Sequence, residues 1–291
     1  MLIFASSACV RHQRIGDSVR ELAAAGFRHI ELTAGTKPYE SLEDELLALR
    51  DELGLTYLVH NYFPPPAEPF VLNLASPDDE IWQRSIDLCR TAIALAQRLG
   101  QTRYSVHAGH LLDLRLGELG KPVADRAVAQ RPAAVERFAR AYQGLQSEFP
   151  DVAIHVENNV LSETNWRTFR TDPFLVTDHA GYLELKSACP DLLLLLDLAH
   201  LQVSCQSLSL PFDEEADKLL AQTDYLHVSD NDGRADSNRG LLSERSAIAT
   251  ALAGKLADQH VVCEIYSGLT DLTTTMKILS SLAQSRKGVE G

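Results

Sequence analysis

The sequence lacks the features that mark several classes of protein. Its five cysteines are scattered without paired spacing, which argues against a disulfide framework or a zinc knuckle. It has no glycine-rich phosphate fingerprint, and Ser267-Gly268 is only a weak candidate for a phosphate loop. No apolar run is long enough to span a bilayer, and the opening MLIFASSACV lacks the basic residues of a secretory signal. We therefore expect a cytoplasmic protein with no membrane role.

Positive charge is also scarce. Lys and Arg number 27 against 40 Asp and Glu, which gives a net charge of −13. Proteins that hold the phosphate backbone need clustered Lys and Arg, so no nucleic-acid partner is expected. What is present is ordinary for a globular domain, with 45% hydrophobic and 23% charged residues. The chain of 291 residues accommodates one α/β barrel of about 250 residues plus loops.

Short apolar segments recur along the chain and alternate with helical patterns. The clearest is 192–200, LLLLLDLAH, whose unbroken leucines predict a strand buried on both faces. The expected strands are 2–7, 29–33, 56–62, 103–107, 152–158, 192–200, 225–230 and 261–266. The expected helices are 19–25, 42–54, 79–99, 133–148, 174–188, 213–222, 244–258 and 271–284. With no linker-like shift in composition, this alternation predicts one (β/α)8 TIM barrel over residues 1–291; a doubly wound open sheet is the alternative.

Polar residues collect where the expected strands end, and in a barrel those ends form the mouth that carries active sites. The last four strands contribute Glu157, Asp197, His227 and Glu264. Three carboxylates and one imidazole form a hard, oxygen-rich set that suits Mn²⁺, Mg²⁺ or Co²⁺ and tolerates Zn²⁺. Unpaired, these carboxylates would repel one another and be costly to bury. The sequence therefore predicts one divalent metal ion held by these four side chains.

Four motifs carry a resemblance to a known superfamily. They are VENN around Glu157, LDLAH ending at His200, HVSDNDG beginning at His227 and CEIY around Glu264. The chain resembles the xylose isomerase-like barrel superfamily of sugar isomerases, ketose 3-epimerases, hydroxypyruvate isomerases, inosose dehydratases and apurinic endonucleases. The resemblance extends over essentially the whole chain, and its motifs are specific to the superfamily but not to one reaction.

The resemblance implies roles for individual residues. In the epimerase members, the residues that match the four predicted ligands hold one divalent metal. The two glutamates, which match Glu157 and Glu264, also move the substrate proton. The histidine that matches His200 contacts the substrate.

The endonuclease members of the superfamily carry additional metal ligands. These additional ligands are two histidines, which match His60 and His107, and an Asp-x-His motif after the seventh strand. Here that segment reads Asp236-Ser237-Asn238, so asparagine replaces the second ligand. The resemblance therefore implies no third metal, and nuclease activity is not expected.

We predict a metal-dependent isomerase or epimerase of a sugar, sugar phosphate or related polyol or hydroxycarbonyl, working through an enediolate. Glu157 and Glu264 are the expected catalytic residues, one removing a proton and the other returning it. The residues expected to contact the carbohydrate substrate are His60, His107, His200, Asn158 and Asp230. A sugar dehydratase (a lyase), an apurinic endonuclease-like phosphodiesterase and a non-catalytic sugar-binding barrel are the alternatives. Whether the chain forms a homo-oligomer is left open.

Overall fold

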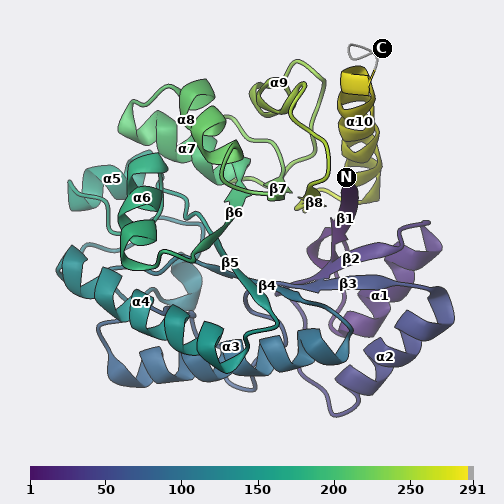
Figure 1. The fold of residues 1–291 in the computed structure, drawn as a ribbon, viewed down its shortest axis with the longest axis horizontal. Coiled ribbons are helices and arrows are strands. Elements are labelled where there is room, and N and C mark those ends of the chain that lie inside the picture. Colours follow the sequence, from purple (N-terminus) through teal and green to yellow (C-terminus); the bar gives the residue numbers. More distant parts are fainter. Residues whose placement is uncertain (288–291) are drawn as a thin grey trace.

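Eight parallel strands wrap into a barrel, and helices surround it (Figure 1). The fold is seen in a computed structural model that describes residues 1–287. The strands are β1 (Leu2–Ser6), β2 (His29–Leu32), β3 (Thr56–Val59), β4 (Arg103–His107), β5 (Ala153–Glu157), β6 (Leu193–Asp197), β7 (Tyr225–Val228) and β8 (His260–Cys263). Their order in the sheet is β3-β2-β1-β8-β7-β6-β5-β4.

The first and last strands are neighbours, and this closes the sheet around an interior. β1 pairs with β8 in register from Leu2 with His260 to Ala5 with Cys263. β3 and β4 are joined by a single parallel bridge between His60 and Ser105. The predicted (β/α)8 barrel is thus confirmed, and the open doubly wound sheet is excluded.

Every connection between consecutive strands contains at least one α-helix, and the connection from β1 to β2 also contains a short 3-10 helix. The α-helices are α1 (Ile15–Ala24), α2 (Leu42–Leu53), α3 (Asp79–Arg98), α4 (Arg131–Glu148), α5 (Glu163–Phe169), α6 (His179–Ala188), α7 (Leu198–Leu208), α8 (Phe212–Leu220), α9 (Ala247–Leu252) and α10 (Leu269–Lys287). The 3-10 helices are η1 (Ser7–Cys9) and η2 (Leu116–Glu118). None of the described helices is both long enough and apolar enough to cross a membrane.

The largest departure from the predicted elements follows β6. The 192–200 run was expected to be one strand, but the strand ends at Asp197 and α7 begins at Leu198. The Asp197 side chain caps this helix, because its Oδ1 accepts from His200 N at 2.8 Å. The strand therefore delivers its carboxylate at the same point where the helix starts.

Other helices also differ from prediction because of capping residues. The helix expected over 174–188 begins only at His179, where Asp178 Oδ1 accepts from Gly181 N at 2.7 Å. An additional helix, α5, begins after the cap Ser162. The helix expected over 244–258 is reduced to α9, and Gly254 just beyond it has a φ of +72° that ends helical geometry.

The leucines of β6 point alternately to the two sides of the sheet, either into the barrel interior or toward the helices. Leu194 and Leu196 belong to the large core between sheet and helices, whereas Leu195 packs inside the barrel with residues of β1, β3, β7 and β8. Side chains alternate along a strand, so Asp197 points to the same side as Leu195. An acid is thereby placed at the mouth on top of an apolar layer.

Candidate metal centre

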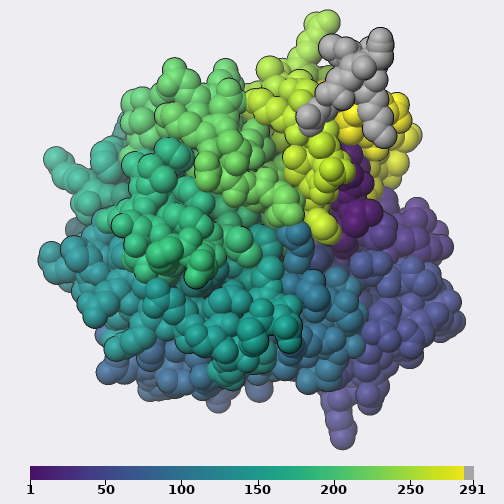
Figure 2. Space-filling model, viewed as in Figure 1, coloured from purple at the N-terminus to yellow at the C-terminus, as the bar shows by residue number. Residues whose placement is uncertain are grey.

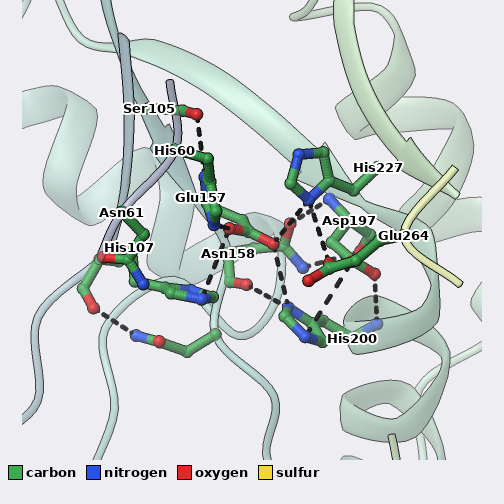
Figure 3. Close-up of polar contacts among 12 residues, drawn as sticks. His60, Asn61, Ser105, His107, Glu157, Asn158, Asp197, His200, His227 and Glu264 are labelled. Carbon is green, nitrogen blue, oxygen red and sulfur yellow. Dashed lines mark hydrogen bonds and ion pairs between the residues drawn. The ribbon is translucent and has the colours of Figure 1, made fainter. Parts of the chain in front are cut away.

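The four predicted ligands meet at the C-terminal mouth of the barrel. Glu157 and Asp197 are the last residues of β5 and β6, His227 lies in β7, and Glu264 directly follows β8. One ligand atom from each of the four lies within 4.8 Å of all the others. Figure 3 shows the four side chains turned toward one another. Their meeting is a direct result of the parallel strands ending at one edge.

The imidazole of His227 stands between the two glutamates. Its Nδ1 is 3.3 Å from Glu157 Oε1 and 3.2 Å from Glu264 Oε2. Asp197 completes the group from β6, with Oδ1 used by the α7 cap and Oδ2 buried without a hydrogen-bond partner among the described residues. The two glutamates therefore approach the group from different strands.

The group fits a divalent cation. Glu157, Asp197 and His227 are fully buried, and Glu264 is 7% exposed. Three carboxylates in a buried space repel one another and have lost their hydration. Neither oxygen of Glu157 has a hydrogen-bond partner among the described residues, although histidine nitrogens approach both at 3.2 Å or more. A cation would supply the missing charge and the missing ligand contacts.

The electrostatics of the two glutamates keep both ionised. Burial alone would raise the pKa of Glu157, but the rings of His107, His227 and His60 outweigh it and hold that pKa well below its usual range. Burial would likewise raise the pKa of Glu264, whereas the hydrogen bond with His227 lowers it to about 2. Both carboxylates can therefore accept a proton at neutral pH.

The pKa values of the other two residues of the group, Asp197 and His227, are raised instead of lowered. Burial raises the pKa of Asp197 to about 7. Burial would lower the pKa of His227, but Glu31 and Glu157 outweigh it and raise that pKa well above its usual value. Without a cation the group thus retains protons, and binding of a cation would release them.

A second potential ligand group adjoins the first and shares Glu157. His60 Nε2 lies 3.2 Å and His107 Nε2 3.5 Å from Glu157 Oε2, and the three residues could hold an ion between them. His60 is buried, with Nδ1 2.9 Å from Ser105 Oγ. The structure therefore places His60 and His107, both predicted substrate contacts, beside the predicted ligands, where they could contact either the substrate or an ion.

His200, also predicted to contact substrate, is held firmly at the mouth. Its Nδ1 donates to Asn158 O at 2.9 Å, and its Nε2 lies 3.3 Å from Asp236 Oδ2. Burial would lower the pKa of His200, but Asp197 and Asp236 outweigh it and raise that pKa well above its usual value. Where the endonuclease pattern would place a further histidine, the buried Asn238 instead accepts from Tyr266 N through its backbone oxygen at 2.8 Å.

Two other predicted substrate contacts have structural partners. Asn158 Nδ2 donates to Asp197 O at 3.0 Å, and its Oδ1 accepts from Asp197 N at 2.7 Å, so it clamps the end of β6 to β5. Asp230 Oδ1 accepts from Asn231 N at 3.0 Å, within the loop that follows β7. The substrate contacts expected of Asn158 and Asp230 stay predictions.

Two residues with contacts to the group received no role from the sequence. Tyr266, 41% exposed, donates its hydroxyl to Glu264 Oε1 at 2.6 Å. Glu31, buried in β2, lies 3.1 Å from His227 Nε2 through Oε1. The signal for Glu31 was available, because it is a lone acid among the apolar residues of β2.

The fold and this group together define a parallel (β/α)8 barrel with a candidate metal centre at its mouth. A sequence model of the family described as xylose isomerase-like TIM barrel matches residues 19–290. The chain belongs to the xylose isomerase-like TIM barrel family.

The curated relatives match only a part of this chain. A probable endonuclease 4 from Thermotoga neapolitana is 30% identical over 89 residues, which cover 31% of this chain and 26% of that protein. The chain thus spans about a quarter of the length of the curated relatives it matches.

Solved structures agree on the fold. A D-tagatose 3-epimerase-like protein has a TM-score of 0.74 and 17% identity, with 100% of both chains covered. A family 2 AP endonuclease from Brucella melitensis has a TM-score of 0.63 and 15% identity, covering 93% of this chain and 95% of that one. At these identities the likeness shows the barrel alone.

Proposed function

We propose that the protein is a divalent-metal-dependent isomerase or epimerase of a sugar, sugar phosphate or related polyol or hydroxycarbonyl. The observation that carries this proposal is the pair of ionised glutamates on either side of one predicted ligand. Both Glu157 and Glu264 lie within 3.3 Å of His227 Nδ1, yet they come from β5 and β8. Two bases that reach one point from different sides suit removal and return of a proton at one carbon.

The reaction needs stabilisation of the charge that develops when the carbon beside a carbonyl loses its proton. Glu157, Asp197, His227 and Glu264 would hold the divalent ion, which when bound stabilises negative charge on adjacent substrate oxygens. Glu157 or Glu264 accepts the proton to give an enediolate, and the same or the opposite glutamate returns it. The hydroxyl of Tyr266 on Glu264 Oε1 fixes the direction of that carboxylate. His200, held by Asn158 and Asp236, would contact the substrate at the mouth.

We further propose that the protein acts on a small molecule in the cytoplasm. Its partner would be a small carbohydrate rather than nucleic acid or a membrane, as the acidic balance of charges favours. A cytoplasmic location is supported by five cysteines that are all buried and free. Self-association into a homo-oligomer is compatible with both.

A screen for exchange of carbon-bound hydrogen tests the proposal directly. The metal-loaded protein is incubated with a panel of sugars and sugar phosphates in D₂O, and deuterium uptake at carbon is measured by NMR. Proton abstraction leads to uptake whatever the product, so a substrate should be found even when its epimer is not known in advance. Absence of uptake across aldoses, ketoses and their phosphates, with metal present, would contradict the proposal. A keto-deoxy product in place of an isomer would instead identify the dehydratase.

A second candidate function is supported by the adjoining group of His60, His107 and Glu157. Two ions that share a bridging carboxylate are suited to cleavage of phosphodiesters, and the matched segment of a probable endonuclease 4 points the same way. We nevertheless expect no cleavage of abasic duplex DNA with Zn²⁺ or Mn²⁺, because Asn238 replaces a ligand and the chain is acidic. Specific, salt-sensitive cutting of such DNA would reverse the order of the two functions.

A further inference from the structure

Glu31 is a buried carboxylate that the proposed reaction does not use. It lies in β2 between Ile30 and Leu32, and none of the three is exposed. An ionised carboxylate in the interior of a barrel is destabilising unless its surroundings compensate it. Its Oε2 has no hydrogen-bond partner among the described residues, so any compensation comes through Oε1.

The partners of Glu31 Oε1 lead to the metal centre. It accepts the hydroxyl of Tyr225 at 2.6 Å and lies 3.1 Å from His227 Nε2. The other ring nitrogen of His227 faces Glu157 and Glu264. The imidazole is therefore held between a carboxylate beneath the centre and the predicted ligands within it.

We infer that Glu31 is the positioning residue that presents Nδ1 of His227 to a divalent cation. A neutral imidazole carries one proton and one lone pair, and the nitrogen that donates a hydrogen bond cannot bind a metal. By accepting Nε2–H, Glu31 leaves the lone pair on Nδ1 and makes that nitrogen more basic. The inference rests on the metal centre of the proposed function, but not on sugar chemistry.

A parallel arrangement orients His60. The Tyr225 hydroxyl lies 3.4 Å from Ser105 Oγ, which in turn is 2.9 Å from His60 Nδ1. His60 thereby directs Nε2 toward Glu157. One hydrogen-bonded chain thus runs from Glu31 on β2 through β7 and β4 to the residue after β3, and it sets the ring orientation of both histidines.

The test compares Glu31→Gln with Glu215→Gln, a matched change at a buried glutamate on α8. Glu215 accepts from His179 N at 2.9 Å and from Lys218 Nζ at 2.7 Å on the outside of the barrel. Zinc affinity is measured by competition with a chromogenic chelator, and thermal unfolding of the metal-free proteins is recorded alongside. Glu31→Gln should weaken zinc binding about 10- to 100-fold, whereas Glu215→Gln should change stability alone. Equal zinc affinities for Glu31→Gln and the unaltered protein would overturn the inference and leave the proposed function standing.

Glu31 also lies close enough to His60 and His227 to be a ligand itself. If Glu31→Gln loses one whole equivalent of zinc and binds any remaining ion as before, then Glu31 is itself a ligand, and the positioning role is overturned. Should Glu31→Gln not fold, ¹⁵N NMR of histidine in the unaltered protein with Zn²⁺ decides the matter. We expect a zinc-bound Nδ1 and a protonated Nε2 for His227; the reverse assignment would refute the inference. An unaltered protein without zinc affinity would remove the proposed function itself.

Discussion

Histidines and acids gather at both ends of the barrel, but their charges are compensated differently. At the N-terminal end, Arg103 donates to both oxygens of Asp224 at 3.0 and 2.6 Å and lies 3.1 Å from His155 Nε2. The ring of His260 stacks on Phe4 with centroids 5.8 Å apart. Arg103 and Asp224 thus compensate each other's charge, and the ring of His260 packs as an aromatic group.

At the C-terminal end the carboxylates exceed the cations. Glu157 and Asp197 are fully buried, and three of their four oxygens have no hydrogen-bond partner among the described residues. Among the residues that the structure describes, no arginine or lysine forms an ion pair with Glu157, Asp197 or Glu264. Both ends of the barrel are thus rich in histidine and acidic residues. The C-terminal end differs because its buried carboxylates lack compensating cations and point toward one place, as expected of an ion site.

The largest expected effect belongs to the C-terminal end. Glu264→Gln retains an oxygen that can bind metal but loses the carboxylate that accepts a proton. We expect kcat to fall about 10²- to 10⁴-fold while fold and metal content persist. The measurement is kcat and deuterium uptake on the best substrate of the panel. His12→Gln is the control, because the half-buried His12, in the loop after β1, pairs with Glu21 and lies outside the ligand group. Near-normal deuterium exchange in Glu264→Gln would show that Glu264 is a ligand and does not move the proton.

Removal of the ion should be the next largest effect. Elemental analysis should find about one divalent ion per chain bound through the four ligands. An ion present at 100 to 1,000 times its Kd stabilises the folded state by about 3–4 kcal/mol, so a chelator should lower the Tm. Asp224→Asn, at the opposite end, should retain both the ion and its stabilisation. A protein that is equally stable with and without metal would contradict this expectation.

The N-terminal end should respond to acid. Burial lowers the pKa of His155 to about 4, against about 6.5 in an unfolded chain. Between these values the unfolded state binds the extra proton, so stability falls as the pH drops from about 6.5 toward 4, by up to about 3 kcal/mol. His155→Phe keeps a ring against Tyr225, whose centroid is 5.2 Å away, and should remove this component. Denaturant unfolding across pH compares the two proteins, and parallel losses of stability would rule out His155 as the cause.

The smallest expected effect comes from the charge pair at the N-terminal end. Arg103→Lys loses the two-pronged contact with Asp224, whose side chain is 55% exposed. Exposed pairs contribute little, so the free energy of unfolding should fall by less than about 1 kcal/mol. Zinc affinity, measured by chelator competition, should not change. A weaker affinity would show that the two ends are coupled through the strands.

The four-ligand group could be predicted because it depends only on strand order. Each ligand closes a short apolar run, and parallel strands of a barrel end at one mouth. Local capping could not be predicted as well. Whether Asp197 continues a strand or starts α7 depends on one hydrogen bond to His200 N, which the leucine run does not encode. The starts of α5 and α6 depend similarly on Ser162 and Asp178.

The residues around the ligands were harder to predict for a different reason. The register of β5 with β6 brings the side chain of Asn158 onto the backbone of Asp197, a contact that the sequence did not indicate. Glu31 lies nearly two hundred positions before its partner His227 in the chain, and the contact exists only because β2 and β7 face each other across the barrel. Such contacts follow from the closed barrel rather than from any motif.

The contact between β3 and β4 closes the barrel through a single bridge, so it is the weakest strand pairing in the sheet. Asn61 N donates to Ser105 O at 2.7 Å beside that bridge, whereas β6 and β7 are joined by a ladder of pairs. Transient opening of the β3–β4 bridge would move His60 away from Glu157, while the other strands stay paired. The Asn61 amide should therefore exchange with solvent faster than the amide of His227, and an ion held through His60 should slow it. Exchange at one amide thus reports whether a second ion is bound.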